Sequence, residues 1–183
     1  MNRVLPLITA ALSCLAFSTA AWTATRNTAP AASGPAAPAP PGTVATKPAA
    51  TLQPLSAHAV GALLAPPAHG ARLLAVWALD CAYCEPNLIA LAALQRAHPA
   101  DFKLVTVATD SITQREAITA RLRKAGVANY PAYAYAEAAP ERLNFLLDSQ
   151  WGGETPRVLL IRADGTRVGI SGELTPAQLM KLR

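Results

Sequence analysis

The folded part of this 183-residue chain is predicted to be an α/β domain with a central mixed β-sheet flanked by helices. Three observations predict this class. A continuous apolar run at 71–78 and a β-branched run at 101–110 are typical of buried strands, and a helical segment at 81–98 connects them. At 157–171 an apolar strand, an Asp-Gly turn and a second strand form a hairpin. Strand, helix and strand at this spacing imply a parallel pair with a right-handed crossover.

Residues 1–24 have the order of a secretory signal peptide. Arg3 is the only charge, an apolar run extends from Val4 to Phe17, and small residues follow. An uncleaved membrane anchor is the alternative, since about 18 apolar residues make a spanning candidate. Cys14 raises lipidation as a third interpretation, although the "ALS" before it lacks the usual leucine. All three interpretations export the rest of the chain, to a periplasmic or other extracytoplasmic location.

Residues 25–54 are predicted to be a disordered linker. They contain seven prolines, nine alanines and no aromatic residue, so they bury too little to offset the entropy of ordering. If the N-terminus stays in the membrane, this linker is a tether. Residues 55–183 then form one domain. It contains 13 Lys and Arg and 11 Asp and Glu, which gives a net charge of 13 − 11 = +2. A nucleic-acid partner is therefore not expected.

The remaining elements follow in order along this domain. Residues 55–65 form a short helix that Pro66 ends. The helix at 81–98 tolerates Pro86 in its first turns and ends before Pro99. Apolar side chains wrap most of its circumference, so it should be deeply packed; they are Leu88, Ile89, Leu91, Ala92 and Leu94.

Capping signals place the later helices. Ser111 with Gln114 forms a capping box, and the helix that it opens is closed by Gly126. A further helix is expected at 140–150. Thr175 is the N-cap of a terminal helix that has proline at its first position.

The segment "CAYC" holds the only two cysteines of the domain, Cys81 and Cys84. A pair three residues apart at a helix start, in an exported chain, favours a redox-active dithiol over a structural disulfide or two inert core residues. Half of a metal site is the other alternative. Zinc usually takes four ligands, however, and the three histidines (His58, His69 and His98) lack ligand spacing, so no metal is expected.

The chemistry of such a pair assigns its two members different roles. The thiolate is the reactive form, and the dipole and free N–H groups of a helix N-terminus stabilise it. Cys81, exposed at the end of the strand, is the expected nucleophile. Cys84, one turn inward, displaces the mixed disulfide and releases the partner, so no cofactor is needed.

Two segments, "VWALDCAYC" and "WGGETPRVLLIRADG", resemble those of the thioredoxin superfamily, and within it the exported TlpA/ResA-like thiol-disulfide oxidoreductases. The resemblance covers about residues 70–183 and implies a thioredoxin-like fold. It also implies that the Thr155-Pro156 bond is cis, lies against the dithiol and presents backbone to an extended substrate. Tyr83 and Trp151 are further candidates for contact with the substrate, each with ordinary packing as the alternative.

The chain departs from the family pattern in places that bear on redox direction. Asp80 replaces the tryptophan that commonly precedes the first cysteine, although Trp77 matches an earlier family tryptophan. Ala75 stands where thioredoxin has a buried carboxylate. Negative charge on Asp80 and Glu85 opposes thiolate formation beside the pair, and no cation lies near them in sequence. Both residues are therefore expected to tune the pair towards a reductant.

The function expected from the sequence is a thiol-disulfide oxidoreductase that reduces disulfides of other exported proteins and draws electrons from a membrane or periplasmic donor. A disulfide oxidase or isomerase is an alternative within the same chemistry. A module that holds a soft metal through Cys81 and Cys84 is the alternative from another class.

Overall fold

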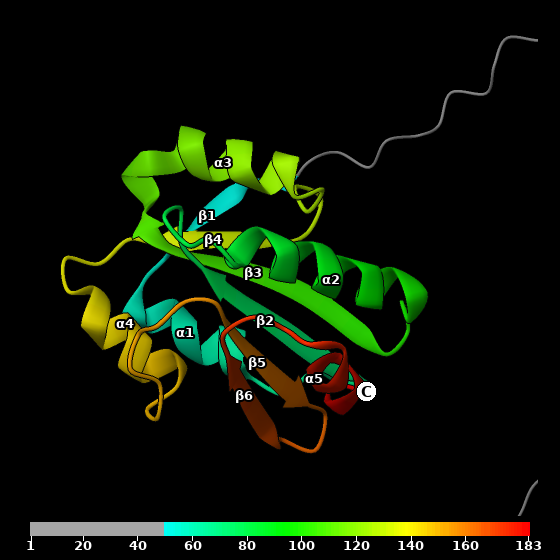
Figure 1. Ribbon diagram of the computed structural model, residues 1–183. Coiled ribbons are helices and arrows are strands. Elements are labelled where there is room, and N and C mark those ends of the chain that lie inside the picture. The colour runs from blue at the N-terminus through cyan, green and yellow to red at the C-terminus, as the bar shows by residue number, and fades with distance from the viewer. Residues whose placement is uncertain (1–49) are drawn as a thin grey trace, which may run out of the picture. The chain divides into compact units, whose positions relative to one another are not determined.

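A six-stranded mixed β-sheet forms the centre of the computed structural model, which describes residues 50–183 (Figure 1). The strands are, in chain order, β1 (Leu52–Leu55), β2 (Ala71–Trp77), β3 (Phe102–Ser111), β4 (Ala132–Tyr135), β5 (Arg157–Arg162) and β6 (Arg167–Ser171). Across the sheet they lie in the order β1-β4-β3-β2-β5-β6. The first four strands pair in parallel, while β5 and β6 pair antiparallel. The predicted α/β class is therefore confirmed.

Helices cover both faces of this sheet, as Figure 1 shows. They are α1 (Ala57–Leu64), α2 (Cys84–Ala97), the short 3-10 helix η1 (Ile112–Gln114), α3 (Arg115–Lys124), α4 (Pro140–Leu147) and α5 (Pro176–Lys181). One core cluster packs α2, α3 and the residues that flank α5 against the sheet, and the other packs α1 and α4 against the opposite face. Because both faces of β2 are buried, its sequence is apolar on both faces apart from Arg72, rather than alternating.

The folded region begins earlier than the predicted boundary at residue 55. Residues 52–54, assigned to the disordered linker, belong to the edge strand β1, which pairs with β4. Leu52 and Leu55 are buried at 5% and 0% exposure, so the strand contributes to both core clusters. Pro54 is compatible with this place because an edge strand has N–H groups that need no ladder partner.

Two predicted helices begin elsewhere. Helix α2 starts at Cys84 rather than Cys81, and residues 81–83 form the turn before it. Its circumference is not fully packed, since Ile89 is 46% exposed. Ser111 caps η1 by accepting from the N–H of Thr113 instead of forming a box with Gln114, and α3 follows from Arg115.

The β5–β6 hairpin and the capped start of the last helix are confirmed. The hairpin turns at Asp164-Gly165, where Gly165 has a φ of 85° that favours glycine. Thr175 and Gln178 form a capping box at the start of α5. The helix expected at 140–150 ends earlier, at Leu147.

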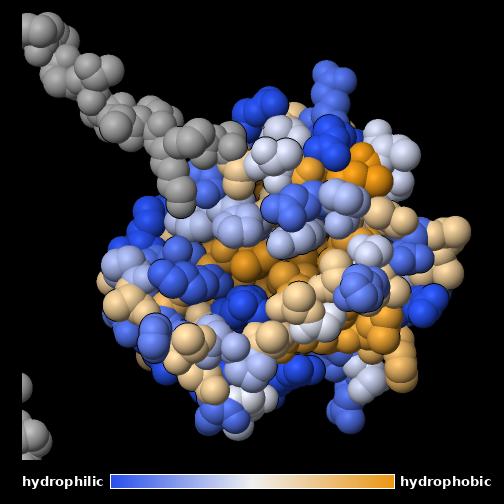
Figure 2. All heavy atoms as spheres, turned by 180° about the vertical axis from the view of Figure 1, so that it is seen from behind, coloured by the Kyte–Doolittle hydropathy of each residue, from blue (hydrophilic) through white to orange (hydrophobic). Residues whose placement is uncertain are grey.

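On the side turned away in Figure 1, apolar side chains are exposed in the middle of the surface within a polar rim (Figure 2).

Candidate functional site

The two cysteines lie at the end of β2, in the turn that leads into α2. They form a disulfide, with their Cα atoms 5.5 Å apart. Cys84 is fully buried as the first residue of α2, whereas Cys81 is partly exposed at the edge of the core. A molecule arriving from solvent therefore reaches Cys81 before Cys84.

A pocket of about 480 Å³ opens beside Cys81. Its walls are the turn residues 79–82 and the side chains of Glu85, Arg121 and Lys124. Glu85 is paired with both cations, since Lys124 Nζ lies 2.9 Å and Arg121 Nε 3.8 Å from its Oε2. Glu85 has no cation near it in sequence, but the fold brings two cations to it. These cations come from α3, about forty residues later in the chain, where a local sequence pattern cannot reveal them.

Asp80 differs from Glu85, because it is exposed in the turn and forms no ion pair within residues 50–183. The neighbouring Leu79 is held on both sides. Its N–H donates to Asp110 Oδ2 at 2.9 Å, and its carbonyl accepts from Arg121 Nη2 at 3.1 Å. Neither of these two hydrogen bonds to Leu79 was predicted from the sequence. The signal for Asp110 was its place near the carboxyl end of β3, which lies beside the carboxyl end of β2 in a parallel pair.

The Thr155-Pro156 bond is cis and precedes β5. Arg157 pairs with Val76 in the antiparallel ladder, so Pro156 falls beside the end of β2 from which the cysteine turn leaves. Pro156 is buried and Thr155 is partly exposed. The fold thus brings the two predicted segments to the same end of the sheet, although more than seventy residues separate them in sequence.

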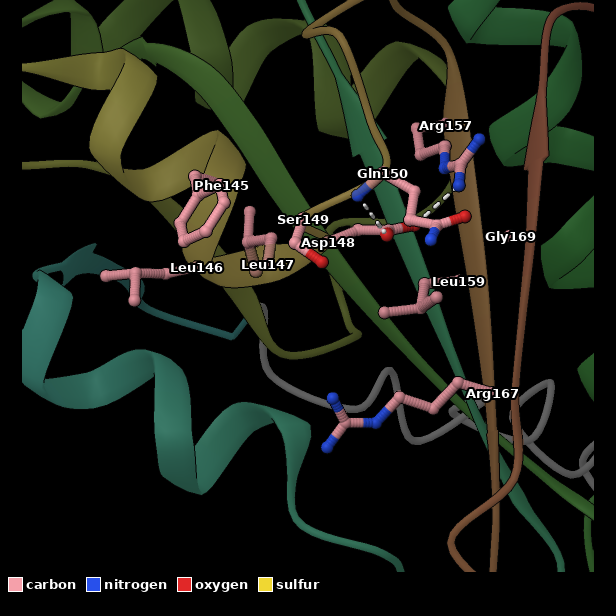
Figure 3. Close-up of a pocket in the computed structure, with 10 residues that line it drawn as sticks. All are labelled: Phe145, Leu146, Leu147, Asp148, Ser149, Gln150, Arg157, Leu159, Arg167 and Gly169. Carbon is pink, nitrogen blue, oxygen red and sulfur yellow. Dashed lines mark hydrogen bonds and ion pairs between the residues drawn. The ribbon is translucent and has the colours of Figure 1, made fainter.

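Arg157 anchors the segment that carries this bond. Its guanidinium pairs with Asp148 at the end of α4 and donates to Ser171 Oγ at 2.8 Å, and the pair with Asp148 is drawn in Figure 3. Ser171 in turn donates to Glu154. This hydrogen bond, together with the charge of Arg157, holds the pKa of Glu154 below its usual value against partial desolvation. A Cβ on Gly169 would lie 2.1 Å from Arg157 Nη2, so the guanidinium crosses β6 where there is no side chain.

The two aromatic candidates have different surroundings. Tyr83, at the N-cap position of α2, is 55% exposed and free to contact a docked molecule. Trp151 is 5% exposed, packs in the cluster beneath α1 and α4, and donates from Nε1 to the Glu154 carbonyl at 2.7 Å. Trp151 thus packs beneath the segment that leads to Thr155, and its contact with substrate stays a prediction.

The sheet beneath the cysteines contains no buried carboxylate among the described residues. Ala75 is buried, and its partner on β3 is Thr106, which is 0% exposed. The buried polar side chains of residues 50–183 are Asn87 and Thr106, both neutral. Within residues 50–183, the core therefore contains no carboxylate that could accept a proton from the cysteines.

The described residues contain neither a candidate metal cluster nor a candidate membrane-spanning helix. Within residues 50–183, no three His, Cys, Asp or Glu side chains gather as they would around a metal ion. No helix in this part of the chain is long and apolar enough to cross a membrane. The predicted signal or anchor at 1–24, with Cys14, and the linker up to residue 49 lie outside the described residues.

Comparison with known proteins gave structural neighbours only. No family model and no curated protein sequence matched. A thioredoxin-related protein from Neisseria meningitidis serogroup B is 20% identical with a TM-score of 0.49, over 62% of this chain and 82% of that one. A secreted Mycobacterium tuberculosis disulfide oxidoreductase homologous to E. coli DsbE is 20% identical with a TM-score of 0.47, over 62% and 79%. StoA from Bacillus subtilis is 20% identical with a TM-score of 0.46, over 64% and 84%.

One of these three neighbours is named as a thioredoxin-related protein and one as a disulfide oxidoreductase, and this chain has a Cys-x-x-Cys disulfide of its own. The identities and TM-scores are too low to carry an activity from those proteins to this one.

Proposed function

We propose that this protein is an exported thiol-disulfide oxidoreductase that reduces disulfides in other exported proteins. The observation that carries the proposal is the asymmetry of the cysteine pair. Cys81 is accessible beside an open pocket, and Cys84 is buried directly behind it within disulfide distance. A structural disulfide needs no such difference in access, whereas an exchange cycle needs one sulfur to meet the partner and one to resolve it.

The reaction conserves sulfur bonds and electrons. In the reduced form, the Cys81 thiolate attacks one sulfur of the partner disulfide, and the other partner sulfur leaves as a thiolate. Cys84, as a thiolate, then attacks Cys81, forms the internal disulfide and releases the second partner thiolate. Two electrons pass from the dithiol to the partner, and the two protons lost by the cysteines match those taken up by the released thiols. The disulfide form described above is the product of this cycle.

Thr155 and Pro156 are the proposed docking segment for the partner chain. They lie at the same end of the sheet as the cysteine turn, and Thr155 is accessible. Tyr83, exposed beside Cys84, adds an aromatic surface for the partner. Main-chain docking of an extended partner gives affinity without demanding one sequence, which suits a reductant of several proteins.

Asp80 supports the reducing direction. Strong oxidants stabilise the reduced thiolate, and an unpaired carboxylate next to Cys81 destabilises it. The second acidic residue, Glu85, contributes less than its charge suggests because Lys124 and Arg121 compensate it. To turn over as a reductant, the protein requires electrons from a membrane or periplasmic dithiol donor. Residues 1–24 direct export, and residues beyond them link the domain to any retained membrane anchor.

Trapping of mixed disulfides tests the exchange activity. The full-length Cys84→Ser chain is produced with its own leader in an exporting host, and cells are quenched with acid before non-reducing electrophoresis. Cys84→Ser should accumulate adducts that a thiol reductant dissolves, because Cys81 attacks but nothing resolves the product. Cys81→Ser is the matched control and should accumulate none. If the two variants behave alike, the assigned roles are wrong.

The reduction potential tests the direction. Equilibration of the wild-type protein against glutathione or dithiothreitol should give a value near or below about −230 mV, in the range of reductants. A value above about −180 mV would instead indicate an oxidase or isomerase. A protein that forms no reversible disulfide, and that binds a soft metal stoichiometrically when reduced, would overturn the proposal.

A further inference from the structure

Asn87 is a buried polar side chain that neither the cysteine chemistry nor the core packing explains. It lies on α2, three residues after Cys84, and is 4% exposed. Its Nδ2 donates to the carbonyl of Gly172 at 2.9 Å, and its Oδ1 accepts from the N–H of Leu174 at 2.9 Å. Both ends of the amide are therefore used to hold the segment between β6 and α5, which comes 85 to 87 positions later in the chain.

The same segment is bonded to the proposed docking site. The N–H of Gly172 donates to the carbonyl of Pro156 at 2.9 Å. Gly172 has a φ of 86°, a conformation that side chains rarely adopt, although a Cβ there would meet nothing within 4 Å. The backbone conformation, rather than a lack of room for a side chain, therefore explains why residue 172 is glycine. Two consecutive hydrogen bonds thus connect the helix that begins at Cys84 with Pro156.

We propose that Asn87 is a positioning residue that sets the Thr155-Pro156 docking segment relative to the Cys81–Cys84 pair. The inference rests on the function proposed above. Disulfide exchange requires the partner sulfur to lie in line with the attacking sulfur, and a displacement of about 1 Å can cost roughly a hundredfold in rate. A partner held by its backbone at Thr155 depends on this geometry. A small disulfide that does not dock is independent of it.

Alternative roles for Asn87 predict different behaviour. If its hydrogen bonds only stabilise the fold, their loss lowers the free energy of unfolding and slows every exchange reaction to the same extent. If they position the docking segment, exchange with a protein disulfide slows while exchange with a small disulfide does not. The ratio of the two rates separates these roles, because it cancels any loss of active protein.

The test compares Asn87→Ala with Gln95→Ala in the otherwise wild-type chain. Gln95 is a matched control because it also lies on α2 and also accepts from a backbone N–H, that of Leu104, but at the far end of the helix. Each reduced protein is oxidised by insulin, as the protein disulfide, and by hydroxyethyl disulfide. For Asn87→Ala, the second-order rate constant with insulin should fall about tenfold, with little change for hydroxyethyl disulfide. Gln95→Ala should leave the ratio of the two rates unchanged.

A second variant covers the case in which Asn87→Ala does not fold. Asn87→Asp keeps the side-chain volume and the acceptor for Leu174 but places an oxygen against the Gly172 carbonyl, so the ratio should fall here too. An unchanged ratio in a folded Asn87 variant, or an equal loss with both disulfides, overturns the positioning role. Failure of the wild-type protein to react with either disulfide would instead refute the proposed function, and the two failures are thereby distinguishable.

Discussion

Substitution of Tyr135 by phenylalanine should lower the free energy of unfolding at neutral pH. At pH 11 the variant should instead be the more stable of the two proteins. Tyr135 ends β4, is 2% exposed, and donates from its hydroxyl to Asn144 Oδ1 at 2.7 Å. Burial raises the pKa of this phenol well above its usual value. Because the folded protein favours the neutral phenol, the stabilisation is complete below the unfolded pKa near 10 and is lost as pH rises above it.

The magnitude follows from these two features. At neutral pH, Tyr135→Phe loses one hydrogen bond, a cost of about 1 kcal/mol in the free energy of unfolding. At pH 11 the unfolded wild-type chain gains about 1.4 kcal/mol by ionising a phenol that stays neutral in the fold, while the variant has no phenol to ionise. The two stability curves should therefore cross between about pH 10 and 11.

Urea unfolding of the oxidised proteins at intervals from pH 8 to 11 measures both curves. Tyr83→Phe, at a side chain that is 55% exposed, is the matched control for a change in tyrosine content. If wild-type protein keeps the same advantage over Tyr135→Phe at pH 11 as at pH 8, the phenol ionises as readily in the fold as in the unfolded chain. The assigned effect of burial would then be refuted.

Three further predictions concern the cysteine helix and its surroundings. Gly169→Ala should lower the free energy of unfolding by about 1–3 kcal/mol in chemical denaturation, because its Cβ displaces the Arg157 guanidinium; no loss would show that Arg157 moves freely. Leu88→Ala, at 1% exposure, should cost about 2–5 kcal/mol. Its neighbour Ile89→Ala, at 46% exposure, should cost less than half as much, and equal costs would contradict the burial of α2. Glu85→Gln leaves two cations uncompensated beside the cysteine turn, so the reduction potential should rise by about 10–30 mV against glutathione; a fall would contradict this electrostatic account.

The cysteine site was only partly predictable from sequence. The position of Cys81 and Cys84 after a buried strand follows from a local motif, and so does their difference in depth. The compensation of Glu85 by cations of α3, the burial of Trp151 and the contacts of Asn87 do not. Each of these features depends on side chains that meet only after distant elements pack. The spacing of residues along the chain does not indicate such long-range contacts.

The fold, like the cysteine site, was only partly predictable from the sequence. The sequence alone determined the buried strands β2 and β3, the β5–β6 hairpin and the capped start of α5, because apolar runs, Asp-Gly turns and capping boxes act over a few residues. Only the tertiary structure decided that Leu52–Leu55 is a strand. Its partner β4 lies about eighty residues away, and a parallel edge strand is defined by that partner's hydrogen bonds rather than by its own composition. The same pairing of distant segments placed Pro156 beside the cysteines, since β5 had to enter the sheet next to β2 before the two could meet.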